Sequence, residues 1–236
     1  MSDFWDWVLS LISGGSKTTT DIPEAPTVVQ PIPEQVAQIQ EQAIPGPDAT
    51  VNTPGAVDAV VSMQQVHQIM PSCPGAKLTL YYPFLAAAMM EFSINTGLRG
   101  AAFLAQVAHE SDSLLYFQEI ASGAAYEGRA DLGNTQPGDG RRYKGRGPIE
   151  LTGRANYRIC GTVLGLDLEN NPERAADPDV GFRIAGWFWS THGCNELADI
   201  GDDASFIAIT RKINGGTNGL TSRQKYYATA RQVLGV

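Results

Sequence analysis

Residues 105–156 decide how this chain is organised. The stretch begins with AQVAHES (105–111), passes Glu119 and ends with YKGRGPIELTGRAN (143–156). Glu110 ends a nearly all-apolar run that predicts a buried helix. A carboxyl group at that position meets the negative end of the helix dipole and apolar neighbours, and both favour its protonated form. A carboxylic acid that stays protonated near neutral pH can donate a proton to a leaving group.

Glu119 lies a short distance further along the chain. An extended segment of this length spans up to about 30 Å, so Glu119 can reach the wall of a cleft opposite Glu110. Inverting glycosidases hold their two carboxyl groups about 6.5–9.5 Å apart, which leaves room for a water molecule. Considered alone, each glutamate is more simply explained as a solvated surface carboxylate, so the pair indicates acid and base roles only together with further motifs.

The composition excludes some classes of function. The chain has 236 residues, 43% apolar content and a net charge of −8. This acidic balance argues against a general nucleic-acid binder, which needs a basic face. No spacing of Cys and His resembles a zinc site, and no metal or cofactor is expected. Cys73, Cys160 and Cys194 are expected to be reduced, partly buried thiols, with a Cys160–Cys194 disulfide as the alternative.

The first quarter of the chain differs from the rest. Residues 3–12 place apolar side chains on one helical face, but so short a helix is not stable alone in water. Residues 1–15 are therefore expected to dock on a protein partner, with a frayed end as the alternative. Residues 16–56 form a Pro-rich, disordered linker with room for a short helix at 33–43. No segment has the roughly 20 apolar residues of a membrane helix, and the N-terminus lacks the basic residues of a secretory signal.

The remaining residues, 57–236, predict one mainly α-helical domain. Apolar periodicity, caps and helix stops indicate helices at 57–70, 84–96 (with Pro83 at its start), 99–109, 154–164, 178–192, 203–213 and 221–233. Residues 121–142 are rich in glycine and predict a long ordered loop or a small β lobe.

Several short motifs follow one another in this domain: His109-Glu110-Ser111, the run 143–152, Asn156-Tyr157, the run 187–189, the run INGG (213–216) and Arg223. Together they resemble the family 19 glycoside hydrolases, which include the plant-type chitinases and related bacterial and phage endolysins. The resemblance covers about residues 80–236. It implies a lysozyme-like, α-rich fold with two lobes, a central cleft and an inverting mechanism.

The resemblance also implies roles for individual residues. Glu110 matches the general acid, Glu119 the general base, and Thr152 the hydroxyl that helps to hold the attacking water. The substrate-binding set that it implies is Asn156, Asn214, Tyr157, His109, Glu150, Arg146 and Arg223. Within this set, the two arginines are expected to brace the cleft and orient carboxylates. Tyr157 is expected to stack on a sugar or to belong to the core, and Trp187 to belong to the core.

Two features depart from the family pattern. Glu150 stands where the family usually has glutamine, and a third carboxylate can shift the pKa of its neighbours. The segment between Glu110 and Glu119 is short, as in endolysins, which keeps Glu127 open as a rival base. A basic cluster (Arg129, Arg141, Arg142, Lys144 and Arg146) is expected either to attract anionic wall polymers or to brace loop carboxylates such as Asp131 and Asp139.

Chitin and peptidoglycan both contain β-1,4-linked N-acetylated sugars, and the motifs do not separate them. The short loop favours an endolysin-like hydrolase of peptidoglycan, with chitinase as the alternative. A catalytically dead wall-binding or structural component of a phage tail or injection apparatus is the non-enzyme alternative. An active enzyme tethered through residues 1–15 to such a particle is a further hypothesis. We expect synthesis in the cytoplasm and action at the bacterial cell wall or periplasm after delivery.

Overall fold

The structure is a computed structural model that describes residues 60–236. The expected docking segment 1–15, the linker 16–56 with its short helix at 33–43, and the domain boundary at residue 57 lie outside the described residues.

The described part of the chain is mainly α-helical, as expected. Its β structure is limited to the isolated bridges Gln118–Arg146 and Arg146–Leu151. The helices are α3 (Met63–Ile69), α4 (Gly75–Glu91), α5 (Gly97–Glu110), α6 (Asp139–Arg142), α7 (Arg154–Leu164), α8 (Pro178–Thr191), α9 (Cys194–Ile200), α10 (Asp203–Asn214) and α11 (Leu220–Leu234). Three short 3-10 turns complete them: η1 (Ala124–Tyr126), η2 (Ala130–Leu132) and η3 (Pro172–Ala176).

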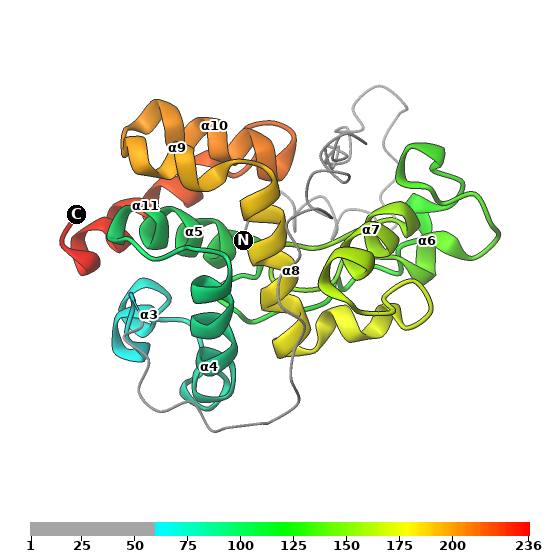
Figure 1. Ribbon diagram of the computed structural model, residues 1–236, viewed down its shortest axis with the longest axis horizontal. Coiled ribbons are helices and arrows are strands. Elements are labelled where there is room, and N and C mark those ends of the chain that lie inside the picture. Colours follow the sequence, from blue (N-terminus) through cyan, green and yellow to red (C-terminus); the bar gives the residue numbers. More distant parts are fainter. Residues whose placement is uncertain (1–59) are drawn as a thin grey trace, which may run out of the picture.

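The helices form two groups with α8 between them (Figure 1). One group contains α3, α4, α5, α9, α10 and α11, and the other contains α6, α7 and the long segment that precedes them. Within the first group α5 packs along α11, while α4 packs against α8. The two expected lobes correspond to these groups, and the smaller one is built from loops and short helices, with isolated bridges in place of a sheet.

Helix α5 is the buried axis of the larger group. Thr96 caps its N-terminus by accepting a hydrogen bond from the backbone N–H of Arg99. All residues from 100 to 109 are buried, which agrees with the apolar run in the sequence. Because its neighbours surround it, the helix holds Glu110 at a fixed position at its C-terminal end.

Helix α4 contradicts the expected helix start at Pro83. The helix begins eight residues earlier, at Gly75, and contains Pro83 in its interior. Proline removes one backbone hydrogen bond from a helix, but Pro83 is exposed. The buried stripe of Leu78, Tyr81 and Leu85 runs past it on the opposite side, so tertiary packing overrides the proline signal.

Other boundaries also differ from the expected ones. The helix expected at 57–70 is seen only as α3, because a capping box of Ser62 and Gln65 starts it at Met63. Residues 92–96 are not helical, and Ser93 has a φ of 57°. Helix α9 was not predicted; it lies between Gly193 and Gly201, which both adopt left-handed backbone conformations. The expected lobe 121–142 consists of η1, η2 and α6.

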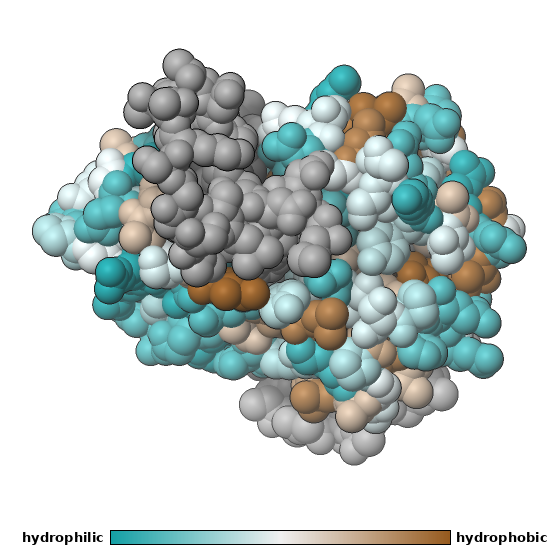
Figure 2. All heavy atoms as spheres, turned by 180° about the vertical axis from the view of Figure 1, so that it is seen from behind, coloured by the Kyte–Doolittle hydropathy of each residue, from teal (hydrophilic) through white to brown (hydrophobic). Residues whose placement is uncertain are grey.

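All three cysteines are free and buried, which confirms reduced thiols and rules out the Cys160–Cys194 disulfide in this structure. Among residues 60–236, no helix combines the length and hydrophobicity needed to cross a membrane. On the face shown in Figure 2, the hydrophobic side chains of the described part are scattered among hydrophilic ones.

Candidate active site

Glu110 is fixed by a buried arginine. Its Oε1 accepts a hydrogen bond and ion pair from Nη2 of Arg223, which lies in α11. The guanidinium of Arg223 is completely buried and also donates to Oε1 of Gln106 at 2.5 Å and to the carbonyl of Asn218 at 3.3 Å. The surroundings of Glu110 are therefore more polar than the apolar sequence run predicts. Arg223 orients this carboxylate, as the family resemblance implies.

The chain leaves Glu110 through a strained turn. Asp112, Ser113 and Leu114 have φ angles of 49°, 59° and 65°, in the left-handed region that non-glycine residues seldom adopt. The turn is held by the Ser111 hydroxyl, which accepts from the N–H of Leu114 at 2.8 Å. Strained backbone of this kind concentrates at functional sites, so the turn supports a functional assignment for the end of α5.

Glu119 is held by a non-local pairing of two extended segments. The N–H of Glu119 donates to the carbonyl of Gly145 at 3.0 Å, and the N–H of Gly145 donates back to Oε2 of Glu119 at 3.1 Å. Two residues earlier, the ring of Phe117 packs against Tyr81 of α4 and Phe182 of α8, with centroids 4.5 and 5.1 Å apart. This aromatic anchor and the backbone pairing fix the Glu119 side chain in the interior, where the residue is 3% exposed.

Burial raises the pKa of Glu119 above its ordinary value. Hydrogen bonds from the Gly145 N–H and the Tyr126 hydroxyl oppose this shift, and so do the charges of Lys144 and Arg146. The Tyr126 hydroxyl donates to Oε1 at 3.3 Å. These donors stabilise the ionised carboxylate that a general base needs. Tyr126 is a residue of the site that the sequence motifs did not identify.

Glu150 and Thr152 lie on a turn that follows directly. The N–H of Glu150 donates to the carbonyl of Gly147, and Glu150 itself has a φ of 58°. The Thr152 hydroxyl donates to the backbone carbonyl of Glu150 at 2.8 Å. Because its hydrogen is used in this way, the Thr152 oxygen can still accept a hydrogen bond through its lone pairs.

Glu150 brings the two expected catalytic acids together electrostatically. Burial raises its pKa well above the ordinary value, and the negative charges of Glu119 and Glu110 raise it further. Both Oε1 and Oε2 of Glu150 are shielded from solvent and have no hydrogen-bond partner among the described residues. Glu150 thus lies within reach of the charges of both acids, and the three carboxyl groups belong to one site.

The expected substrate-binding residues divide into two kinds. Asn156 is buried and donates to the carbonyl of Thr152 at 2.7 Å, so it lies beside the turn. Oδ1 of Asn214, at the end of α10, is shielded without a hydrogen-bond partner in the described part. His109 is buried beside Gly219, where a side chain larger than hydrogen would collide with its ring. Contacts of these three residues with substrate stay predictions.

Two further residues have structural positions. Tyr157 is completely buried; its hydroxyl donates to the carbonyl of Lys144 at 2.7 Å and accepts from Arg146 at 3.0 Å. Its ring therefore belongs to the core, which corrects its place among the sugar-binding residues. Arg146 also donates to the carbonyl of Arg142 at 2.9 Å, and it orients backbone rather than a carboxylate through these hydrogen bonds. Trp187 is in the core, as expected.

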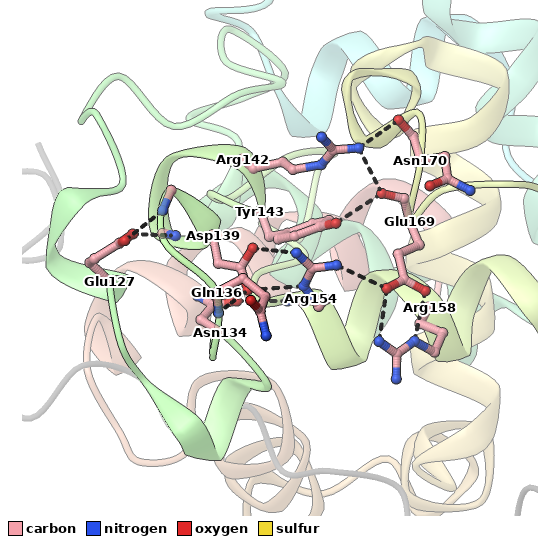
Figure 3. Close-up of polar contacts among 12 residues, drawn as sticks. Glu127, Asn134, Gln136, Asp139, Arg142, Tyr143, Arg154, Arg158, Glu169 and Asn170 are labelled. Atoms are coloured by element: carbon pink, nitrogen blue, oxygen red, sulfur yellow. Dashed lines mark hydrogen bonds and ion pairs between the residues drawn. The ribbon is translucent and has the colours of Figure 1, made fainter.

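Glu127, the rival base, is occupied elsewhere. Its carboxylate accepts hydrogen bonds from the backbone N–H groups of Gly138 and Gly140, at 2.6 and 2.9 Å. Figure 3 shows this side chain in the loop of the smaller lobe. The residue is exposed. Glu127 ties one part of the loop to another, and we assign the base to Glu119.

The basic cluster mainly braces the smaller lobe. Arg129 pairs with Asp131, Arg142 donates to the carbonyls of Glu169 and Asn170, and Lys144 donates to the carbonyl of Glu119 at 2.8 Å. Asp139, however, is paired by an arginine outside the cluster. Arg154, the first residue of α7, binds Asp139 at 2.5 Å and Glu169 at 3.1 Å, and Arg158 binds Glu169 at 2.7 Å (Figure 3).

This network makes the smaller lobe sensitive to acid. The Arg158 hydrogen bond is the main cause that lowers the pKa of Glu169 from 4.5 to about 2, with a further contribution from Arg154. A lowered pKa stabilises the folded state above pH 4.5, and this contribution is lost as the pH falls toward about 2. Because the pair is partly solvated, we expect Glu169→Gln to lower the free energy of unfolding by about 1–2 kcal/mol at pH 7.

Urea titrations of the wild type and Glu169→Gln at pH 7, 4 and 2.5 measure this effect. The stability difference is expected to shrink in the acidic titrations. The exposed Glu173, replaced by Gln, serves as the control. A difference that stays constant with pH would contradict the assignment.

A pocket of about 530 Å³ lies next to the end of α5 that carries the expected acid. His109 and Asp112 line one side, and residues 217–222, Lys225 and Tyr226 line the other. The lining does not include Glu119, Thr152 or Asn156. The pocket therefore adjoins the Glu110 side of the site.

Comparison with known proteins agrees with the resemblance. The sequence profile of the family described as chitinase class I matches residues 60–199. Endochitinase At2g43620 of Arabidopsis thaliana is 36% identical over 197 residues, which are 79% of this chain and 65% of that protein. A glycosyl hydrolase family 19 domain-containing protein of Haemophilus influenzae is 30% identical over 178 residues, covering 62% of this chain and 85% of the relative. The matched region thus spans a little under two thirds of this Arabidopsis protein.

Solved structures show the same fold. Chitinase C from Streptomyces griseus HUT6037 superimposes with a TM-score of 0.61 at 27% identity, over 78% of this chain and 96% of that protein. A bacterial family 19 chitinase superimposes with a TM-score of 0.61 at 30% identity, over 75% of this chain and 96% of that one. Helix order, the buried acidic site and these matches lead to one conclusion: the chain belongs to the chitinase class I family, glycoside hydrolase family 19.

Proposed function

We propose that this protein hydrolyses β-1,4 bonds between N-acetylated sugars and inverts the configuration of the anomeric carbon. The observation that carries the proposal is the shared site of Glu110 and Glu119, both of which act electrostatically on Glu150. Two carboxyl groups with different surroundings suit the separate roles of acid and base.

Glu110 is the proton donor in this mechanism. Arg223 engages its Oε1, so Oε2 is the oxygen that faces the glycosidic bond. As the bond between the anomeric carbon and the glycosidic oxygen breaks, Glu110 transfers its proton to that oxygen.

Glu119 is the base, and Thr152 supports the attacking water. Glu119 removes one proton from the water while the water oxygen bonds to the anomeric carbon from the opposite face of the sugar. The Thr152 oxygen accepts the other hydrogen of this water, since its own hydrogen is bound to the carbonyl of Glu150. One proton is given and one is taken in each turnover, and both glutamates exchange protons with solvent before the next.

Two substrates satisfy this chemistry. The names of the curated relatives support chitin, while the short segment from Glu110 to Glu119 favours peptidoglycan. The test incubates the full chain with chitin oligomers and with purified peptidoglycan, and measures new reducing ends and product masses. Glu110→Gln serves as the inactive control. Release of reducing ends from neither substrate would reject the proposed function.

A further inference from the structure

Glu150 has an unusual environment for a carboxyl group. Both of its oxygens are shielded from solvent, yet none of the described residues donates a hydrogen bond to either. The backbone of Glu150 is held at a φ of 58° by the turn from Gly147. Buried carboxylates normally have hydrogen bonds or a paired cation, since an isolated buried charge is very costly.

The two nearby cations are engaged by backbone oxygens. Lys144 donates to the carbonyls of Glu119 and Ala121, at 2.8 and 3.3 Å. Arg146 donates to the carbonyls of Arg142 and Lys144 and to the hydroxyl of Tyr157. Both charges lower the pKa of Glu150, but burial and the two neighbouring glutamates raise it more.

Glu150 and Glu119 flank the same glycine. A Cβ added to Gly145 would collide with Oε2 of Glu150 and would lie 3.3 Å from Oε2 of Glu119. Glu119 has two donors, the Gly145 N–H and the Tyr126 hydroxyl, whereas Glu150 has none among the described residues. When two close carboxyl groups share one proton, the proton resides on the group whose charge is less stabilised.

We propose that Glu150 is a positioning residue of the catalytic centre, held as a neutral carboxylic acid so that the negative charge of the pair stays on Glu119. The inference rests on the proposed function, because it explains how Glu119 remains available to accept a proton from water. A second charge at position 150 would repel the charge on Glu119 and drive the proton onto the base. Gly145 is required because it leaves room for both carboxyl groups.

Other occupants of this site do not fit as well. Within residues 60–236, no group of three or more His, Cys, Asp or Glu side chains is arranged to hold a metal ion. The phenols of Tyr126 and Tyr157 have raised pKa values, mainly through burial, so they remain neutral beside Glu150. The charged groups that act on Glu150 are thus Glu119, Glu110, Lys144 and Arg146.

The decisive test compares the stability of the full chain with that of Glu150→Gln as a function of pH. Glutamine has the shape of the neutral acid and cannot ionise. A folded-state pKa above the unfolded value means that the stability contributed by the proton is complete below the unfolded pKa and is lost as the pH rises toward the folded one. Glu150→Gln removes this loss, so its melting temperature should match the wild type at pH 4 and exceed it by about 2 °C or more at pH 7.

Two arms complete the experiment. The exposed Glu173→Gln should show a pH-independent difference from the wild type. In the activity assay, Glu150→Ala should lower kcat at least about tenfold, and Glu150→Gln should restore most of this loss. A melting-temperature difference for Glu150→Gln that is constant or falls with pH would overturn the proposal, and so would a Gln variant as impaired as the Ala variant. The melting experiment needs no substrate, so it separates failure of this inference from failure of the proposed function.

Discussion

Glu110→Gln and Glu119→Gln are each expected to lose about 10²–10⁴-fold in kcat while the fold stays intact. Glutamine at position 110 cannot donate a proton to the glycosidic oxygen, although it can still accept the hydrogen bond from Arg223. Glutamine at position 119 can accept the Gly145 N–H through its carbonyl oxygen but cannot remove a proton from water. Steady-state hydrolysis of chitin oligomers or peptidoglycan measures both losses.

Glu127→Gln is the matched control for these variants. Its carboxylate binds two backbone N–H groups in the smaller lobe, so the substitution should affect stability more than kcat. Melting temperatures of all three variants establish that they are folded. A Glu127→Gln variant that loses as much activity as Glu119→Gln would transfer the role of base to Glu127.

Arg223→Ala is expected to lower the free energy of unfolding by about 3–5 kcal/mol. The substitution leaves Glu110 without its cation and Gln106 without its donor, and both side chains are largely buried. Partner removal at a buried pair is costly because the remaining charge is not compensated. Loss of the large, completely buried arginine side chain also leaves a cavity.

Arg158→Ala provides the comparison for Arg223→Ala. The side chain of Arg158 is 58% exposed and pairs with Glu169 on the surface, where removal of an ion pair typically costs about 1 kcal/mol or less. Urea denaturation of the two variants at pH 7 should therefore give clearly different losses. Equal losses would show that Arg223 does not hold the end of α5.

Local sequence signals predicted much of the fold. Helix α7 begins and ends as expected because Gly153 and Gly165 bound it, and α5 and α8 follow from long apolar runs. Pro83 misled the prediction for α4, since a proline on the exposed side of a helix does not interrupt the buried stripe. The short α9 has too few apolar positions to produce a clear periodic signal.

The motifs identified the acids of the site but not their surroundings. The positions of Glu110, Glu119, Glu150 and Thr152 along the chain gave no partner for any of them. Tyr126, Gly145 and Arg154 contribute through contacts between segments distant in sequence, which no local pattern predicts. Tyr157 shows the opposite error, because an aromatic residue next to a substrate-binding asparagine in sequence faces the core.

The stereochemistry of the first product tests the central claim most directly. NMR spectra of a chitin oligomer digest, recorded with the full chain before the products mutarotate, report the configuration at the newly formed reducing end. If Glu110 protonates the leaving oxygen while Glu119 activates a water, this end is the α anomer, opposite to the β configuration of the substrate bond. A β anomer as the first product would contradict the account, because net retention requires a different arrangement of the two carboxyl groups.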